Sequence, residues 1–221
     1  MKKRISLVVG WTVLGLLMNP GARASLVTSL PGGTLIPLPN SMAEIATDPL
    51  TIAPGITATS TNPDGSLIGA VSYSFVNNGT WDGTAALIAV QTDVFGSDAY
   101  GVKLFFAKPV AGVGGFFNYA YPLLGFDNVK IKAFDIGGNE LESFDISDKA
   151  PIDTPFAVNG GAFFGFLRST PDIAAFSLEN SGVAMKDLTI VEAAATVPEP
   201  GTVFLVVLTL LLSGVWRVYR A

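Results

Sequence analysis

Residues 129–146 read VKIKAFDIGGNELESFDI, and their pattern indicates the fold class. Apolar and polar residues alternate on both sides of a central DIGGN (residues 135–139), which has the composition of a tight turn. Alternation with a period of two is typical of a strand that buries one face. The stretch therefore predicts a β-hairpin that joins residues 129–135 to residues 141–146.

The same pattern recurs along the middle of the chain. Residues 66–76 (SLIGAVSYSFV) alternate and stop at Asn77-Asn78-Gly79, a strong turn signal. Residues 25–60 are rich in proline and predict one or two extended strands with loops rather than a separate domain. Further strands bounded by Gly, Asn or Asp are expected at 85–92, 102–107, 113–120, 162–167, 173–178 and 185–191. Nine short strands without a helical period predict an all-β fold, an antiparallel β-sandwich over residues 25–196.

Composition excludes several classes of function. Residues 25–197 hold seven Lys and Arg against seventeen Asp and Glu, a net charge of −10, whereas the whole chain carries −5. An acidic body repels phosphate backbones, so no nucleic acid is expected as a partner. The chain has no cysteine and no histidine, which excludes disulfides and thiolate metal sites and removes the usual catalytic base. We therefore expect no catalytic residue, no metal and no cofactor.

The first 24 residues have the order of a secretory signal peptide. Three positive charges within residues 1–4 precede an apolar run at 5–18, and Ala22-Arg23-Ala24 fits the small-residue cleavage pattern. Cleavage is expected between Ala24 and Ser25. The alternative is an uncleaved N-terminal anchor.

The last residues form a second apolar segment. Val197 and a Pro198-Glu199-Pro200 turn precede an apolar run at 203–216, which Arg217 and Arg220 follow. As a helix this run would span about 21 Å, at roughly 1.5 Å per residue, against a hydrocarbon core of about 30 Å. The arginines favour the cytoplasmic side and reach the headgroups. The segment predicts a marginal transmembrane helix, and a short buried core helix is the alternative.

This order of parts closely resembles the PEP-CTERM sorting signal of exopolysaccharide-producing Gram-negative bacteria. The resemblance covers residues 197–221. It implies that an exosortase-type membrane protease is the partner that reads Pro198-Glu199-Pro200 and removes the segment. It also implies export through the inner membrane, transient anchoring there, and a final location at the cell surface or outside the cell.

Residues 65–192 have a looser resemblance to the jelly-roll bodies that often precede such signals, similar in outline to carbohydrate-binding sandwiches. It is carried by KPVAGVGGFFNYA (108–120), DNVKIKAFDIGGNELESFDI (127–146), FFGFLRSTPDIAAFSLEN (163–180) and MKDLTI (185–190). The resemblance implies a sandwich of jelly-roll type. The closing strand of such bodies often begins with two acidic residues, whereas here Lys186 precedes Asp187, so an acidic pair suited to a cation is absent.

Aromatic side chains are the candidate binding residues. Trp81 lies in a GTWDG turn at 79–83, and Tyr119 and Tyr121 share one face if their strand continues. Exposed rings beside Asp82 and Asn118 are suited to stacking on sugars. A structural role is favoured over this one: Trp81 would close one end of the sandwich, and the tyrosine hydroxyls would be hydrogen-bonded at its rim. One member of each Phe-Phe pair, at 105–106, 116–117 and 163–164, is expected to face the core.

Acidic residues give a second candidate chemistry. A glycosidase needs two carboxyl groups about 5 to 10 Å apart. Nine carboxylates are candidates: Asp93, Asp98, Asp127, Asp135, Glu140, Glu142, Asp145, Asp148 and Asp153. Most lie beside turn residues or alternate outward, which favours a solvated surface. Asp64 and Asp98 lie in loops that suit calcium, or else they close their own turns.

Two classes of function follow from these observations. The first is a non-catalytic, exported surface or matrix protein that contacts exopolysaccharide and the exosortase-type protease. The alternative is an extracellular glycoside hydrolase that uses paired carboxylates. The missing histidine and the lack of a GxSxG or SxxK phrase favour the first.

Overall fold

The computed structural model describes residues 25–193 apart from positions 63–64, 71, 73, 76–77, 82, 90–100, 121–127, 148, 150–156 and 180–181. The regular elements in these residues are fourteen strands, and their pairings are antiparallel. The predicted all-β, antiparallel class is therefore confirmed. This part of the chain contains no helix long and apolar enough to cross a membrane. The expected signal peptide and the expected helix at 203–216 lie outside it.

Sheet A contains eight strands in the order β1-β12-β9-β14-β7-β6-β3, with β2 paired to one end of β14. Its strands are β1 (Ser25–Val27), β2 (Thr34–Leu35), β3 (Ala43–Ile45), β6 (Ser66–Ala70), β7 (Ala85–Ala89), β9 (Gly112–Tyr119), β12 (Ala162–Leu167) and β14 (Val183–Val191).

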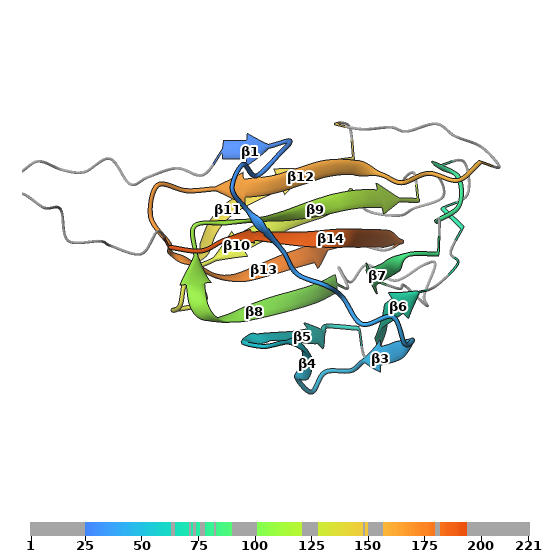
Figure 1. The fold of residues 1–221 in the computed structure, drawn as a ribbon, viewed down its shortest axis with the longest axis horizontal. Helices are drawn as coiled ribbons and strands as arrows, with labels where there is room; N and C mark the ends of the chain where they lie inside the picture. The colour runs from blue at the N-terminus through green and yellow to red at the C-terminus, as the bar shows by residue number, and fades with distance from the viewer. Residues whose placement is uncertain are drawn as a thin grey trace, which may run out of the picture.

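Sheet B contains six strands in the order β11-β10-β13-β8-β5-β4. They are β4 (Leu50–Ala53), β5 (Ile56–Ser60), β8 (Gly101–Val110), β10 (Lys130–Phe134), β11 (Glu140–Asp145) and β13 (Ile173–Glu179). Figure 1 shows β10, β11 and β13 of sheet B behind β9, β12 and β14 of sheet A. The two sheets enclose one shared apolar core, as in a β-sandwich.

The predicted hairpin at residues 129–146 is confirmed. β10 pairs with β11 in a register that sets Ile131 opposite Phe144. Asp135 closes the turn, since its carboxylate accepts hydrogen bonds from the backbone and side-chain nitrogens of Asn139 at 2.8 and 2.9 Å. Gly138 has a φ of 80°, the left-handed conformation that glycine adopts without strain.

The strand predicted at 66–76 is shorter in the structure. β6 ends at Ala70, and beyond it Ser74 forms an isolated bridge with Thr80. The predicted turn is present, because the backbone N–H of Phe75 donates to the carbonyl oxygen of Gly79 at 2.8 Å.

The expectation of one or two strands in residues 25–60 is wrong, because this segment contributes five short strands, β1 to β5, to both sheets. Figure 1 shows the segment, in blue, running across the outer face of sheet A from β1 to β3. The segment passes close to β14 at Gly33, because a Cβ on Gly33 would lie 2.5 Å from Cγ2 of Thr189. Pairing with distant strands creates these short elements, so their own alternation is too brief to predict them.

The main core lies between the sheets and is rich in phenylalanine. The ring of Phe176 on β13 is 6.4 Å from that of Phe117 and 6.0 Å from that of Phe166, both on sheet A. The predicted alternation of the Phe pairs is confirmed, since Phe106, Phe117 and Phe164 are buried. Their neighbours Phe105 and Phe116 face outward, with exposed fractions of 39% and 36%.

A second, smaller apolar cluster covers part of the outer face of sheet A. It contains Phe75, Trp81, Ala86, Ile88 and Ala184, with Leu67 packed against it. Ala86 and Ile88 alternate along β7 with Leu87 and Ala89, which belong to the main core. Both faces of β7 are therefore buried.

Both ends of the described body lie at one end of sheet A. Ser25 pairs with Leu167, Leu167 with Gly112, and Gly112 with Val191. These four residues form one row across four neighbouring strands, so Ser25 and Val191 are about 15 Å apart at an interstrand spacing of roughly 4.8 Å. The chain enters and leaves the body on the same side.

Candidate functional site

Trp81, a candidate stacking residue, is buried with an exposed fraction of 2%. Its indole Nε1 donates to the carbonyl oxygen of Thr84 at 3.0 Å, and its ring meets that of Phe75 edge to face at 5.9 Å. Trp81 is therefore not an exposed platform. Its burial agrees with the favoured structural role, although the indole covers the outer face of sheet A rather than one end of the sandwich. The outward apolar residues of β7 and β14 need a cover, and this indole provides it.

Tyr119 is also part of the core, with an exposed fraction of 1%. It points inward from β9, where its hydroxyl donates to the carbonyl oxygen of Ile146 at 2.9 Å, with that of Ser147 at 3.2 Å. A ring in this position has no free face for a ligand, so Tyr119 does not serve as a stacking residue. Its bonded hydroxyl agrees with the favoured structural role. Tyr121 lies outside the described residues, as do Ala22, Ala24 and the sorting residues Val197, Pro198, Glu199, Pro200, Arg217 and Arg220.

Three buried asparagines hold the loops beside Tyr119. Nδ2 of Asn78 donates to the carbonyl oxygen of Tyr119 at 2.9 Å, and Nδ2 of Asn159 donates to the carbonyl oxygen of Asn78 at 2.8 Å. Asn118 completes the cluster by donating to the carbonyl oxygen of Asn78 at 3.3 Å. Asn118 was expected beside a ligand, yet it serves this internal network, which satisfies backbone groups that would otherwise be unpaired.

Four of the nine candidate carboxylates lie in the described part of the chain: Asp135, Glu140, Glu142 and Asp145. Asp135 closes its own turn, and the hydrogen bonds from Asn139 lower its pKa. Burial acts to raise the pKa of Asp145, but hydrogen bonds from Ser147 and Asn128 outweigh it, so the pKa lies below its usual value. Both groups therefore stabilise turns as ionised carboxylates. Asp64, Asp93, Asp98, Asp127, Asp148 and Asp153 are outside the described residues.

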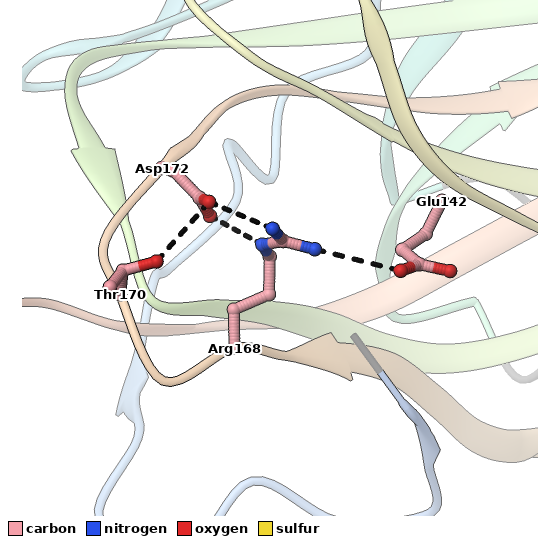
Figure 2. A network of polar contacts seen from close by, with 4 residues as sticks. All are labelled: Glu142, Arg168, Thr170 and Asp172. Carbon is pink, nitrogen blue, oxygen red and sulfur yellow. Dashed lines mark hydrogen bonds and ion pairs between the residues drawn. The ribbon is translucent and has the colours of Figure 1, made fainter. Parts of the chain in front are cut away.

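Glu142 belongs to an ion-pair cluster around Arg168, which Figure 2 shows between two carboxylates. Arg168 follows β12, and its side chain has an exposed fraction of 7%. Its Nε and Nη2 donate to the two oxygens of Asp172, the second at 2.8 Å, and its Nη1 lies 3.6 Å from Glu142. Thr170 also donates to Asp172, at 3.2 Å. The cluster ties the β12–β13 connection to the edge strand β11.

Arg168→Ala is expected to lower the free energy of unfolding by about 2 kcal/mol, because two partly buried carboxylates would lose their shared cation. Arg168→Lys should recover only part of this loss, since an ammonium does not reproduce the bidentate fork. Urea unfolding followed by circular dichroism measures both variants. Lys108→Ala, at an exposed position, is the matched control. An Arg168→Ala variant as stable as that control would contradict the assignment.

The outer face of sheet B carries charged, aromatic and hydroxyl side chains. One row across β10, β13 and β8 contains Lys132, Ser177 and Lys103, and the next contains Phe134, Ala175 and Phe105. Nζ of Lys132 lies 2.7 Å from Glu179 and 3.6 Å from Glu140. The hydrogen bond from Lys132 to Glu179 raises the pKa of Lys132.

Lys103 has a different environment on the same face. Its Nζ lies 3.6 Å from the ring centroid of Phe134 and 5.6 Å from that of Phe105. Burial lowers the pKa of Lys103, the charge of Glu179 opposes this, and the charge of Lys132 adds to it. The ammonium is therefore held against ring faces, where cation–π attraction stabilises it.

A cavity of about 500 Å³ opens at the end of the sandwich where the chain enters and leaves. Lys108 and Glu192 are the charged groups among its described lining residues. The remainder of that lining is Ile36, Pro54, Gly55, Ile56, Phe106, Ala107, Pro109, Val110, Ile190 and Ala193. Within the described residues, no three acidic side chains gather as a metal site.

Comparisons with known proteins give weak likenesses. No protein-family model and no curated protein matches the chain. A solved DUF4465 family protein from Bacteroides caccae is 12% identical, with a TM-score of 0.34, over 82% of this chain and 97% of its own. The enzymatically active domain of tailspike protein 4 from bacteriophage CBA120 is 14% identical, with a TM-score of 0.23, over 68% of this chain and 19% of its own.

The sequence did not indicate Phe105, Phe134 or Lys103 as candidate site residues. The Phe-Phe pairs predicted core residues, yet the same alternation places Phe105 on the outer face, with Lys103 two residues before it. Phe134 could be identified as a neighbour of Lys103 only once the register of β10, β13 and β8 was known.

Proposed function

We propose that this chain is an exported, non-catalytic surface or matrix protein that an exosortase-type protease processes and that contacts exopolysaccharide. The observation that carries the proposal is the row Ser25, Leu167, Gly112 and Val191. This row supports a body whose N-terminal and C-terminal extensions both leave from one end. A membrane-engaged segment at either end would then hold the opposite end of the sandwich away from the membrane.

The pairing of Ser25 is compatible with the proposed signal peptide. Ser25, the residue after the proposed cleavage site, is in register with Leu167 of β12. Removal of residues 1–24 would keep the pairs that Ser25, Leu26 and Val27 form with β12.

We also infer a jelly roll for the eight strands β7 to β14. Four of them have the order β7-β14-β9-β12 in sheet A, and the other four have the order β8-β13-β10-β11 in sheet B. The order supports two four-stranded sheets joined by Greek-key connections, the arrangement of a double-sheet jelly roll. Lectin domains are among the proteins that use this architecture, so the inference is compatible with a binding function.

The hydrolase alternative is less well supported. It needs one carboxyl group that holds a proton beside one that is ionised. Glu140 and Glu179 share the ammonium of Lys132, and Glu142 and Asp172 share the guanidinium of Arg168. Both described pairs therefore take part in ion pairs, which gives them a structural role.

Replacing Pro198, Glu199 and Pro200 together with alanine is expected to leave the body folded and to trap the unprocessed chain in the inner membrane. Two prolines present an extended segment without backbone donors, which suits recognition by a protease. The test expresses both chains in cells that contain the exosortase-type protease and measures their masses in membrane and released fractions. The released wild-type protein should begin at Ser25 and lack the residues that follow its processing site.

Thr196→Ala is the matched control, because it changes a neighbouring residue outside the Pro-Glu-Pro turn. This variant should be processed like the wild type. Release of the triple variant at the wild-type rate would contradict the proposed sorting signal. An intact Met1 as the main exported N-terminus would contradict the proposed signal peptide.

A further inference from the structure

We propose that the outer face of sheet B is the glycan site and that it selects an acidic sugar, with Phe105 as the stacking platform and Lys103 as the group that binds the sugar carboxylate. The inference rests on the proposed contact with exopolysaccharide and names the residues and the ligand class. The proposed site uses Phe105 and Lys103 in place of the earlier candidates Trp81 and Tyr119, whose rings are buried.

Phe105 has the exposure that a stacking residue needs. It lies on β8, a central strand of sheet B, and 39% of its side chain remains accessible. Thr57 on β5 and Ala175 on β13 are its partners across the two neighbouring strands. Small side chains on both sides leave the ring raised above the sheet. A flat sugar face packs favourably on such a ring, and the hydroxyl of Thr57 is placed to meet polar edges.

Lys103 supplies a cation that the described residues do not neutralise by direct contact. The two nearby carboxylates, Glu140 and Glu179, are bound by Lys132. The ammonium of Lys103 instead lies against Phe134 and 5.6 Å from the ring centroid of Phe105. A carboxylate on a sugar stacked at Phe105 would therefore reach an ammonium that has already lost part of its hydration, which strengthens the interaction.

Phe134 acts as a positioning residue. Its ring lies 3.6 Å from Nζ of Lys103 and holds the ammonium near the sheet, between β10 and β8. Phe105 and Phe134 occupy one row with Ala175 between them, two strand spacings or about 10 Å apart. The lysine fills this interval, so its charge is preorganised and loses little side-chain entropy when a ligand binds.

The net charge of the body does not oppose an acidic ligand at this face. Three lysines (Lys103, Lys130 and Lys132) and three carboxylates (Glu140, Asp145 and Glu179) point outward from sheet B, so the face is close to neutral. Charges elsewhere on the acidic surface are screened beyond a Debye length of about 8 to 10 Å. The cavity at the end of the sandwich is less suited, because its described lining is largely aliphatic.

The test measures the affinity of the full chain, purified in detergent, for a galacturonic acid oligomer and for a cello-oligosaccharide of equal length, by isothermal titration calorimetry. The wild type should bind the acidic oligomer more tightly than the neutral one. Lys103→Met keeps the apolar stem and should weaken binding of the acidic oligomer about tenfold while leaving the neutral oligomer unaffected. Phe105→Ala should weaken binding of both oligomers about fivefold to tenfold.

Phe116→Ala is the matched control, because this phenylalanine has nearly the same exposure on the outer face of sheet A. It should bind both oligomers like the wild type. If Lys103→Met and Phe105→Ala both bind the acidic oligomer as tightly as the wild type does, the proposed site is wrong. A glycan contact elsewhere on the body would remain compatible with that result. A wild-type chain that binds neither oligomer would overturn the inference. If the exopolysaccharide of the expressing cells also failed to bind, the proposed contact with that polymer would fall as well.

Discussion

Phe176→Ala is expected to lower the free energy of unfolding by about 3 to 5 kcal/mol, a large share of the roughly 5 to 15 kcal/mol that stabilises a typical domain. The side chain is fully buried on β13 and touches Phe117 and Phe166 across the interface between the sheets. Its removal leaves a cavity between two sheets whose strands cannot move closer without breaking other contacts. Urea unfolding of the full chain in detergent, followed by circular dichroism, measures the loss.

Phe105→Ala provides the comparison for this prediction. Phe105 is the cross-strand neighbour of Ala175, immediately before Phe176, but it points to solvent. Its replacement should change the stability by about 0.5 kcal/mol or less. Equal losses in the two variants would contradict the assignment of one face of sheet B to the core and the other to solvent.

Trp81→Ala is expected to cost a similar amount, about 3 to 5 kcal/mol, because it removes the largest side chain from the cluster on the outer face of sheet A. The variant would also leave the carbonyl oxygen of Thr84 without the indole donor. Thermal unfolding followed by circular dichroism should show a clearly lower midpoint.

Ile136→Ala is the control for the Trp81 variant, since Ile136 is 83% exposed at the tip of the β10–β11 hairpin. Its unfolding midpoint should stay near the wild-type value. A Trp81→Ala variant with the wild-type midpoint would show that the indole contributes nothing to the fold and would restore it as a candidate ligand platform.

The long strands and their turns were predictable because their signals are local. Alternation along β10 and β11, with Asp135 and Gly138 in the turn, predicted a hairpin that forms in the expected place. The same reasoning predicted that one phenylalanine of each pair enters the core, as Phe106, Phe117 and Phe164 do. Side chains that alternate along a strand must face opposite sides, so one buried member decides the position of the other.

The sequence predicted a residue type for the glycan contact but not the position of such residues in the fold. Aromatic rings beside polar groups were expected to bind sugars, yet the residues chosen for this role, Trp81 and Tyr119, are buried. The polar residues that flank Trp81 in sequence are compatible with an exposed side chain, so they do not by themselves predict its burial. Its burial depends on Ile88 and Ala184, which come from two other strands of sheet A.

The all-β class, the hairpin and the acidic, cysteine-free character of the body were predictable from the sequence, because each depends on composition or on residues close together in the chain. The packing of distant strands sets which aromatic rings face solvent and where the two ends of the body lie. It also decided that Lys103 lies between Phe105 and Phe134, residues from two strands with β13 between them. Strand order and register determine such neighbours. Sequences with the same local alternation can adopt different strand orders and registers, so the alternation alone does not predict these contacts.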